Sequence, residues 1–197
     1  MRRPRPVVLG LTGTYGSGKT TAAKLFERLG ALRLDADAIV HRLYARDRAL
    51  ARSMARALGP GVLQAGRLNR LALAESIFRD ARARRQLERL VHPRVRRALA
   101  RAVALTRRRV VVMEVPLLFE SGFDRECDAT VAVLAPARSL GRRLGARARE
   151  LARRNAAQWP ARRKARRADY VLHNAGSRRA LARGVKLIFR LFTADVP

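Results

Sequence analysis

A complete phosphate-binding loop near the start of the chain constrains the fold more than any other feature. Residues 13–20 read G-T-Y-G-S-G-K-T and match G-x-x-x-x-G-K-[ST] at every fixed position. The apolar run over 7–11 predicts a buried strand, and the spacing over 21–29 predicts a helix that ends at Gly30. A strand, this loop and a helix form the context in which the motif binds phosphate. The sequence therefore predicts an α/β fold of the P-loop NTPase type.

Each part of the loop has a task in phosphate binding. The glycines let successive backbone N–H groups turn towards a polyphosphate, and the helix that follows adds its N-terminal dipole. Lys19 would reach the β- and γ-phosphates, and the hydroxyl of Thr20 would hold Mg²⁺. The candidate phosphate-binding residues of the motif are Gly13, Thr14, Tyr15, Gly16, Ser17, Gly18, Lys19 and Thr20.

Strands and helices alternate along the rest of the chain. Further strands are predicted over 31–34, 109–115, 129–134 and 169–172. Helices are predicted over 38–58, 71–78, 81–106 and 178–192, and 63–70 reads as a turn-rich connection. A break at His92-Pro93 is an alternative within the third of these helices, because proline disfavours helix at the residue before it. The alternation predicts a three-layer α/β/α fold with a parallel sheet and right-handed crossovers.

The length of 197 residues suits a single domain, 1–197, with an insertion. The helical stretch between the second and third strands is too long for one crossover helix, so part of it is expected to stand off the sheet. We predict a core over about 1–37, 107–137 and 168–197, a helical substrate-binding insertion over about 38–106, and an Arg-rich lid over about 138–167.

The segment 138–167 contains twelve basic residues and a single acid, Glu150. It is either a pair of solvated helix faces or a lid whose arginines close over the phosphates. A site for phosphoryl transfer needs cations on the transferring group, which favours the lid.

The net charge of +29 raises the question of nucleic-acid binding. The 44 basic residues, all but four of them arginine, are spread along the whole chain, and aromatic residues make up only 5%. Stacking platforms for bases are therefore scarce, and we expect no nucleic-acid partner. Attraction for polyanionic small molecules is the milder implication, and a purely compositional origin of the charge stays open.

Composition also bears on the compartment. Cys127 is the only cysteine, so no intrachain disulfide can form, which fits a cytoplasmic protein. The apolar run after the basic N-terminus is short and leads into the phosphate loop, so it is expected to be a strand and not a signal peptide. No stretch approaches the ~18 apolar residues of a membrane helix, and no membrane association is expected.

Two carboxylates, Asp35 and Asp37, follow the second predicted strand. Ligands bind at the edge where the strands of an open α/β sheet end. A carboxylate there can accept the proton of a hydroxyl that attacks a γ-phosphate. An N-cap for the next helix is the alternative role. The spacing alone leaves open which aspartate does which.

Several segments together resemble dephospho-CoA kinases. The opening G-L-T-G-T-Y-G-S-G-K-T-T of 10–21 is followed by L-D-A-D-A-I and His41. The later segments agree in order and approximate spacing: G-R-L-N-R of 66–70 with Ile77-Phe78, His92-Pro93, V-P-L-L-F-E of 115–120, A-A-Q of 156–158, and A-D-Y-V of 168–171 with Asn174 and Gly176. The resemblance runs from about Val8 to Leu181.

The resemblance implies a P-loop kinase of the nucleoside-monophosphate-kinase type. Such an enzyme transfers the γ-phosphate of ATP to the ribose 3′-hydroxyl of dephospho-CoA, the last step of CoA synthesis, with ATP and Mg²⁺ as cofactors. The resemblance adds Thr21 to the ATP-phosphate ligands and places Asn174 and Gly176 near the adenine. It favours Asp37 over Asp35 as the base. The implied substrate-binding residues are Asp35, Asp37, His92, Pro116 and Leu117, and a monomer is implied.

Two departures from the family pattern bear on mechanism. Glu114 stands where aspartate is frequent, and a longer carboxylate can still hold Mg²⁺ through a water. The lid is shortened, which leaves its phosphate-binding arginine open among Arg142, Arg143 and Arg147; Arg143 is the predicted catalytic cation. The rival functions are another P-loop small-molecule or nucleoside-monophosphate kinase, a basic nucleic-acid-binding ATPase, and a family member that binds nucleotide without turnover.

Overall fold

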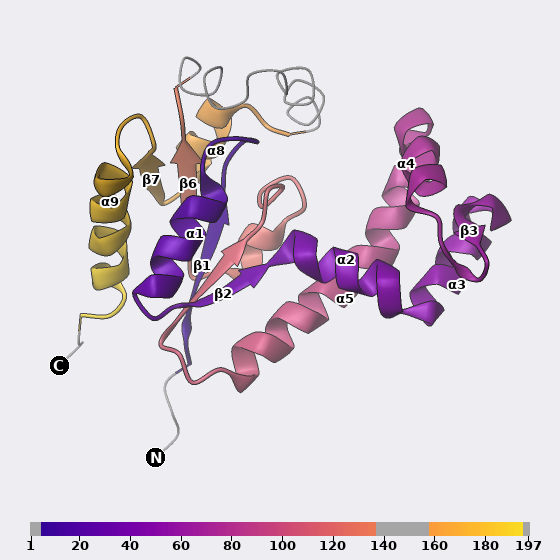
Figure 1. The fold of residues 1–197 in the computed structure, drawn as a ribbon, viewed down its shortest axis with the longest axis horizontal. Coiled ribbons are helices and arrows are strands. Elements are labelled where there is room, and N and C mark those ends of the chain that lie inside the picture. The colour runs from indigo at the N-terminus through magenta and orange to yellow at the C-terminus, as the bar shows by residue number, and fades with distance from the viewer. Residues whose placement is uncertain (1–4, 137–157, 195–197) are drawn as a thin grey trace. The chain divides into compact units, whose positions relative to one another are not determined.

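The computed structural model describes residues 5–136 and 158–194 (Figure 1). Contacts between residues divide the chain into two compact units. The first comprises Met1–Asp35 and Val103–Pro197, and the second comprises Ala36–Ala102.

The first unit is built on a five-stranded parallel sheet. Its strands are β1 (Val7–Thr12), β2 (Leu32–Asp35), β5 (Val110–Glu114), β6 (Ala129–Leu134) and β7 (Tyr170–His173), in the spatial order β2-β5-β1-β6-β7. Every pair is parallel, so all five strands end at the same edge, called the carboxyl edge below. The predicted strands are confirmed to within about two residues at their ends. The α/β class and the parallel sheet are confirmed with them.

One face of this sheet is covered by α1 (Lys19–Arg28) and α9 (Arg178–Leu191), which also contact each other. Side chains alternate between the faces of a strand, so Leu9 and Leu11 of β1 point to the same side. They join Phe26 of α1 and Val185 of α9 in the main apolar core, where all four are fully buried. Figure 1 shows α1 beside β1 and α9 beside β7.

Gly10 of β1 points to the other face, against the connection between β5 and β6. A Cβ at Gly10 would lie 2.7 Å from the Sγ of Cys127 and 2.9 Å from Leu118, so only glycine fits there. Burial, with smaller contributions from nearby carboxylates, raises the pKa of the Cys127 thiol to about 12. The thiol is therefore a packing group and not a nucleophile. This connection includes the 3₁₀ turn η2 (Phe123–Glu126).

The second unit consists of helices and one small hairpin. Its elements are α2 (Ala36–Arg46), α3 (Arg48–Leu58), η1 (Pro60–Val62), β3 (Leu63–Gln64), β4 (Arg67–Leu68), α4 (Arg70–Arg79) and α5 (Ala81–Leu105), the last of which runs into the first unit. Among the described residues, no helix of the chain is long and apolar enough to cross a membrane.

The single helix predicted over 38–58 is wrong, because the chain forms two helices that meet at Asp47. The Asp47 carboxylate caps α3 by accepting a hydrogen bond from the Leu50 amide at 2.8 Å. Its second oxygen accepts from Arg94 at 3.3 Å. The cap favours a new helix start at Asp47 over one continuous helix. The contact with Arg94, which is distant in sequence, supports the cap and cannot be seen in the local pattern.

The alternative of a break at His92-Pro93 is also wrong, since α5 is continuous through Pro93. Proline inside a helix costs about 3 kcal/mol. The buried residues of α5 recur at every fourth position on both sides of the proline: Ala83, Leu87, Val91, Val95 and Leu99. Burial of this unbroken stripe outweighs the local cost.

Asp169, the acid of the A-D-Y-V segment, ties β6 to β7 at the edge opposite the carboxyl edge. Its Oδ2 accepts from the Thr130 amide at 2.8 Å and from the Thr130 hydroxyl at 2.7 Å. The hydroxyl bond is the main cause that lowers the pKa of the Asp169 carboxyl. This residue therefore has a structural role.

Asp169→Asn is expected to lower the free energy of unfolding by about 1 kcal/mol at pH 7, with unchanged turnover. The folded-state pKa lies below the unfolded value of 3.8. The stabilisation is therefore complete above about pH 5 and is lost as the pH falls through the folded-state pKa. Urea denaturation of both proteins from about pH 7 down to pH 3 measures this. A difference between variant and wild type that stays constant over that range would contradict the role.

Candidate active site

The phosphate loop connects β1 to α1 at the carboxyl edge. Gly16 and Gly18 have φ values of 78° and 97°, which favour glycine, and Gly18 is the N-cap of α1. Lys19 is the first residue of the helix, and its ammonium donates to the Thr14 carbonyl at 3.1 Å. The hydroxyl of Ser17 is buried and has no hydrogen-bond partner in the part of the chain that the structure describes. The loop thus has the backbone form that phosphate binding requires.

Asn174, which directly follows the edge strand β7, holds this loop. Its side-chain amide donates to the Ser17 carbonyl at 2.8 Å, and its own backbone amide donates to Leu134 at 2.6 Å. A Cβ at Gly18 would lie 2.2 Å from the Nδ2 of Asn174, so only glycine fits at position 18. The sequence predicted Asn174 as a nucleotide contact, and the structure adds a direct role in shaping the loop.

A cavity of about 440 Å³ opens at the loop. It is lined by Tyr15, Gly16, Gly18, Lys19, Thr20, Thr21, Asn174, Gly176, Arg178 and Leu181. The structure therefore gathers most of the predicted ATP ligands around one cavity, whereas Gly13, Thr14 and Ser17 are buried within the loop. The sequence analysis missed Arg178. Arg178 could have been predicted, because Ser177 is a typical N-cap residue and the helix that it caps begins two residues after the predicted Gly176 contact.

A hydroxyl, a carboxylate and a guanidinium form a connected set of hydrogen bonds next to the loop. The hydroxyl of Thr20 donates to Glu114 Oε1 at 2.5 Å, and the guanidinium of Arg33 contacts Glu114 Oε2 at 2.8 Å. Glu114 is 5% exposed at the end of β5, beside β1. A hydroxyl and a carboxylate oxygen are donors that suit Mg²⁺, which takes one or two carboxylates together with substrate phosphates. The sequence analysis missed Arg33, whose partners are Asp35 at the end of its own strand β2 and Glu114 at the end of β5.

The two candidate bases have different surroundings. Asp35 ends β2, pairs in register with Glu114, and forms an ion pair with Arg33 at 3.2 Å. Asp37 belongs to the second unit, in the first turn of α2. Asp35 and Glu114 therefore share one cation, the guanidinium of Arg33. The spacing of the two aspartates in the sequence did not reveal this.

The remaining predicted substrate-binding residues are distributed over both units. His92 lies on α5 in the second unit, beside a shallow cavity of about 360 Å³ lined by Arg85, Glu88, Arg89, His92 and Pro93. Burial lowers the pKa of His92, with Glu88 opposing and Arg96 adding to the effect, so the ring is neutral at pH 7. Pro116 and Leu117 follow β5 in the first unit, and Leu117 is 37% exposed.

The predicted lid is described only in its last part. Arg142, Arg143 and Arg147 lie outside the described residues. Lys164, one of the twelve basic residues of that segment, is not solvated. It is fully buried on α8 (Ala161–Arg167) at the carboxyl edge.

The parallel sheet, the phosphate loop after its first strand and the acid at the end of the neighbouring strand define the class of P-loop kinases. The family model described as dephospho-CoA kinase matches residues 7–179. The chain therefore belongs to the dephospho-CoA kinase family and is an enzyme of the kinase class.

Individual relatives agree with this assignment. A dephospho-CoA kinase from Symbiobacterium thermophilum is 43% identical over 86% of this chain and 74% of its own length. One from Thermus thermophilus is 38% identical over 95% of this chain and 93% of its own. A crystal structure of a Thermus thermophilus protein superposes with a TM-score of 0.83 at 37% identity, covering 95% of this chain and 98% of that one. A Campylobacter jejuni dephospho-CoA kinase, 22% identical with a TM-score of 0.70, shares the fold over the same fractions.

Proposed function

We propose that the chain transfers the γ-phosphate of ATP to the ribose 3′-hydroxyl of dephospho-CoA, the step that completes CoA. The observation that carries the proposal is the cavity in which Lys19 and Thr20 of the phosphate loop meet Asn174 and Gly176. These are the residues that the family motifs assign to ATP, and they come from opposite ends of the chain. Family membership supports the choice of acceptor over a nucleoside monophosphate.

Catalysis would depend on positioning and on charge neutralisation. The N–H groups of the loop bind the phosphates, and Lys19 exchanges its bond to the Thr14 carbonyl for the β- and γ-phosphates. We assign the base to Asp37, which would orient the acceptor hydroxyl and take its proton. The resemblance of the segment L-D-A-D-A-I over 34–39 to the family motif supports this choice.

Thr20 and Glu114 would hold Mg²⁺, the Thr20 hydroxyl directly and Glu114 through a water. When bound, the metal would neutralise charge that develops on the β- and γ-phosphate oxygens. Arg33 would hold the Glu114 carboxylate in its orientation towards Thr20. Glutamate in place of the more frequent aspartate is compatible with this arrangement, since its Oε1 already reaches the Thr20 hydroxyl.

Glu114→Gln is expected to raise the Mg²⁺ concentration for half-maximal activity about tenfold, because the neutral amide removes one charge next to the metal and leaves Arg33 without its main anion. A Mg²⁺ titration of ADP release at saturating ATP measures this. Glu27→Gln, an exposed acid on α1 with the same charge change, serves as the control. Unaltered Mg²⁺ dependence in the Glu114 variant would remove this residue from the metal site.

The function is tested by ADP release with ATP and Mg²⁺, in separate reactions with dephospho-CoA, AMP, CMP and RNA. Stoichiometric conversion of dephospho-CoA to CoA, with the other compounds inert, is the expected result. Turnover of AMP or CMP in its place would favour a nucleoside-monophosphate kinase. ATPase activity that RNA stimulates, with a steep salt dependence, would favour a nucleic-acid-dependent enzyme.

We further propose that the enzyme works as a monomer in the cytoplasm, without a nucleic-acid partner. A reducing compartment suits the single thiol of Cys127, which is free in this fold. Sedimentation equilibrium at about micromolar concentration measures the oligomeric state. A dimer mass would contradict the monomer.

A further inference from the structure

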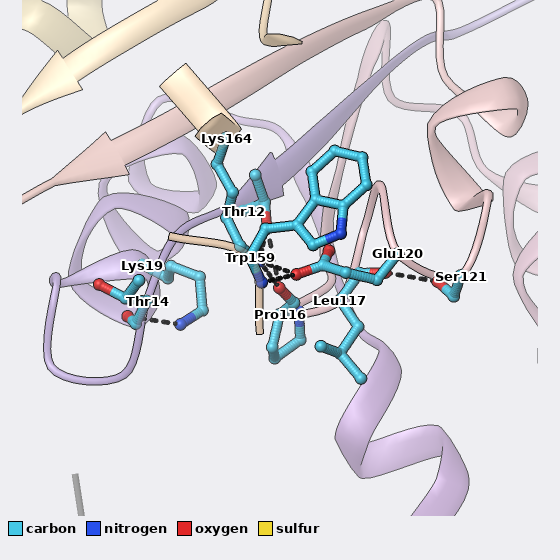
Figure 2. A network of polar contacts seen from close by, with 9 residues as sticks. All are labelled: Thr12, Thr14, Lys19, Pro116, Leu117, Glu120, Ser121, Trp159 and Lys164. Atoms are coloured by element: carbon cyan, nitrogen blue, oxygen red, sulfur yellow. Dashed lines mark hydrogen bonds and ion pairs between the residues drawn. The ribbon is translucent and has the colours of Figure 1, made fainter. Parts of the chain in front are cut away.

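Lys164 connects α8 to two segments at the carboxyl edge (Figure 2). Its side chain is 0% exposed. The ammonium donates to the Pro116 carbonyl, lies 2.9 Å from Glu120 Oε1, and lies 3.4 Å from the Thr12 hydroxyl oxygen. An ammonium has three N–H donors, and here it meets three oxygens that belong to two segments, the end of β1 and residues 116–120.

The three partners lie next to the predicted catalytic machinery. Thr12 is the last residue of β1 and directly precedes the phosphate loop. Its hydroxyl also donates to the Pro116 carbonyl, at 3.0 Å. Pro116 begins the segment that contains Leu117, and both are predicted acceptor contacts. The ammonium therefore holds the start of the phosphate loop and the start of the acceptor-binding segment at a fixed separation.

The stability of the fold does not by itself account for this buried charge. Removing an ammonium from water is costly, and burial lowers the pKa of Lys164 although Glu120 opposes this shift. Buried ion pairs can often be replaced by apolar residues of similar volume without loss of stability. The cost of burying this ammonium is therefore better explained by the groups that Lys164 holds in place.

The entry into α8 is secured by contacts that do not involve Lys164. Glu120 Oε1 accepts a hydrogen bond from the Trp159 amide at 2.7 Å. The Trp159 ring stacks on Phe119 at 6.1 Å between centroids, and the Arg163 guanidinium lies 3.6 Å from the centre of the Trp159 ring. A variant at Lys164 is therefore expected to keep α8 in place.

We propose that Lys164 is a positioning residue for phosphoryl transfer. Its ammonium fixes the Pro116 carbonyl against Thr12, and so sets the separation between the phosphate loop and the acceptor. Glu120 keeps that ammonium charged and directed at the two oxygens. This inference rests on the proposed function, because it assumes that the acceptor binds along Pro116 and Leu117.

The test separates positioning from stability with two variants. Lys164→Met leaves Glu120 buried without its cation and is expected to lower both the melting temperature and turnover. Lys164→Met combined with Glu120→Gln removes both charges, and the glutamine oxygen can still accept from the Trp159 amide. The double variant is expected to melt close to the wild type and to remain about 10²-fold lower in kcat/KM for dephospho-CoA, because misplacement by about 1 Å costs that much.

The KM for ATP is expected to stay within about twofold in the double variant, since Asn174 holds the phosphate loop independently. Lys186→Met, the same substitution at an exposed lysine on α9, is the control and is expected to behave as the wild type. Recovery of turnover together with stability in the double variant would overturn the positioning role and leave Lys164 a structural residue.

Hydrogen exchange provides a readout that does not depend on the acceptor. In the double variant, amides of the segment 115–121 are expected to exchange faster, whereas amides of the phosphate loop keep the wild-type rate. Unchanged exchange over 115–121 would overturn the inference even if activity fell. Failure of the wild type to phosphorylate dephospho-CoA would instead contradict the proposed function, and the exchange measurement would still decide whether Lys164 holds the segment.

Discussion

Replacing Lys19 by alanine is expected to lower kcat by about 10³-fold or more while the protein stays folded. The residue begins α1, and its ammonium already lies on the loop, where it donates to the Thr14 carbonyl. This is the loop cation that can meet the charge developing on the transferring phosphoryl group. The folded state loses the partly buried hydrogen bond to the Thr14 carbonyl, worth about 1 kcal/mol. Single-turnover ADP release and thermal unfolding measure the two effects.

Lys24→Ala is the matched control for that experiment. Lys24 lies on the same helix with its side chain exposed, so the substitution removes the same charge five residues further along. Near-normal kcat is expected, because the side chain is absent from the cavity lining. Equal losses in the two variants would mean that the net charge of α1 matters and the position of Lys19 does not.

The strands were predictable because their signal is local. Each reads as a short apolar run, and the run over Ala129–Leu134 has in the structure the bounds that the sequence predicts. The split between α2 and α3 was not predictable from the same kind of pattern. Asp47 lies in a stretch with continuous helical spacing, and its cap is supported by Arg94 from another helix. Tertiary contacts of this kind override local propensity.

The phosphate site was predictable for a related reason, since its residues are nearly contiguous in one motif. The contacts that link Thr20 to Glu114 and Glu114 to Arg33 were not predictable, because they join residues that lie 94 and 81 positions apart in the sequence. Lys164 shows the limit most clearly. Within a run of exposed arginines it looks like another solvated cation, and its burial follows from oxygens that belong to Thr12, Pro116 and Glu120. Only the fold brings these groups together.

Asp37→Asn is expected to lower kcat by about 10²- to 10⁴-fold, with much less change in the KM for ATP. The amide keeps the size of the side chain and can still orient a hydroxyl, but it accepts no proton. The phosphate loop, which binds the nucleotide, is on the other unit and is unaltered by the substitution. Steady-state kinetics with ATP and dephospho-CoA varied in turn separate the two effects.

Asp35→Asn is the informative comparison, because it makes the same chemical change two residues away. Asp35 is paired with Arg33, which also contacts Glu114. Losing that pair is expected to disturb Glu114, the proposed Mg²⁺ ligand, through Arg33. We therefore expect kcat to fall by less than about tenfold and the Mg²⁺ requirement to rise. The spacing of the two aspartates alone could not choose between them, and the two kinetic signatures can. Near-normal turnover in the Asp37 variant, with a large loss in the Asp35 variant, would move the base to Asp35 and assign Asp37 to the helix N-terminus.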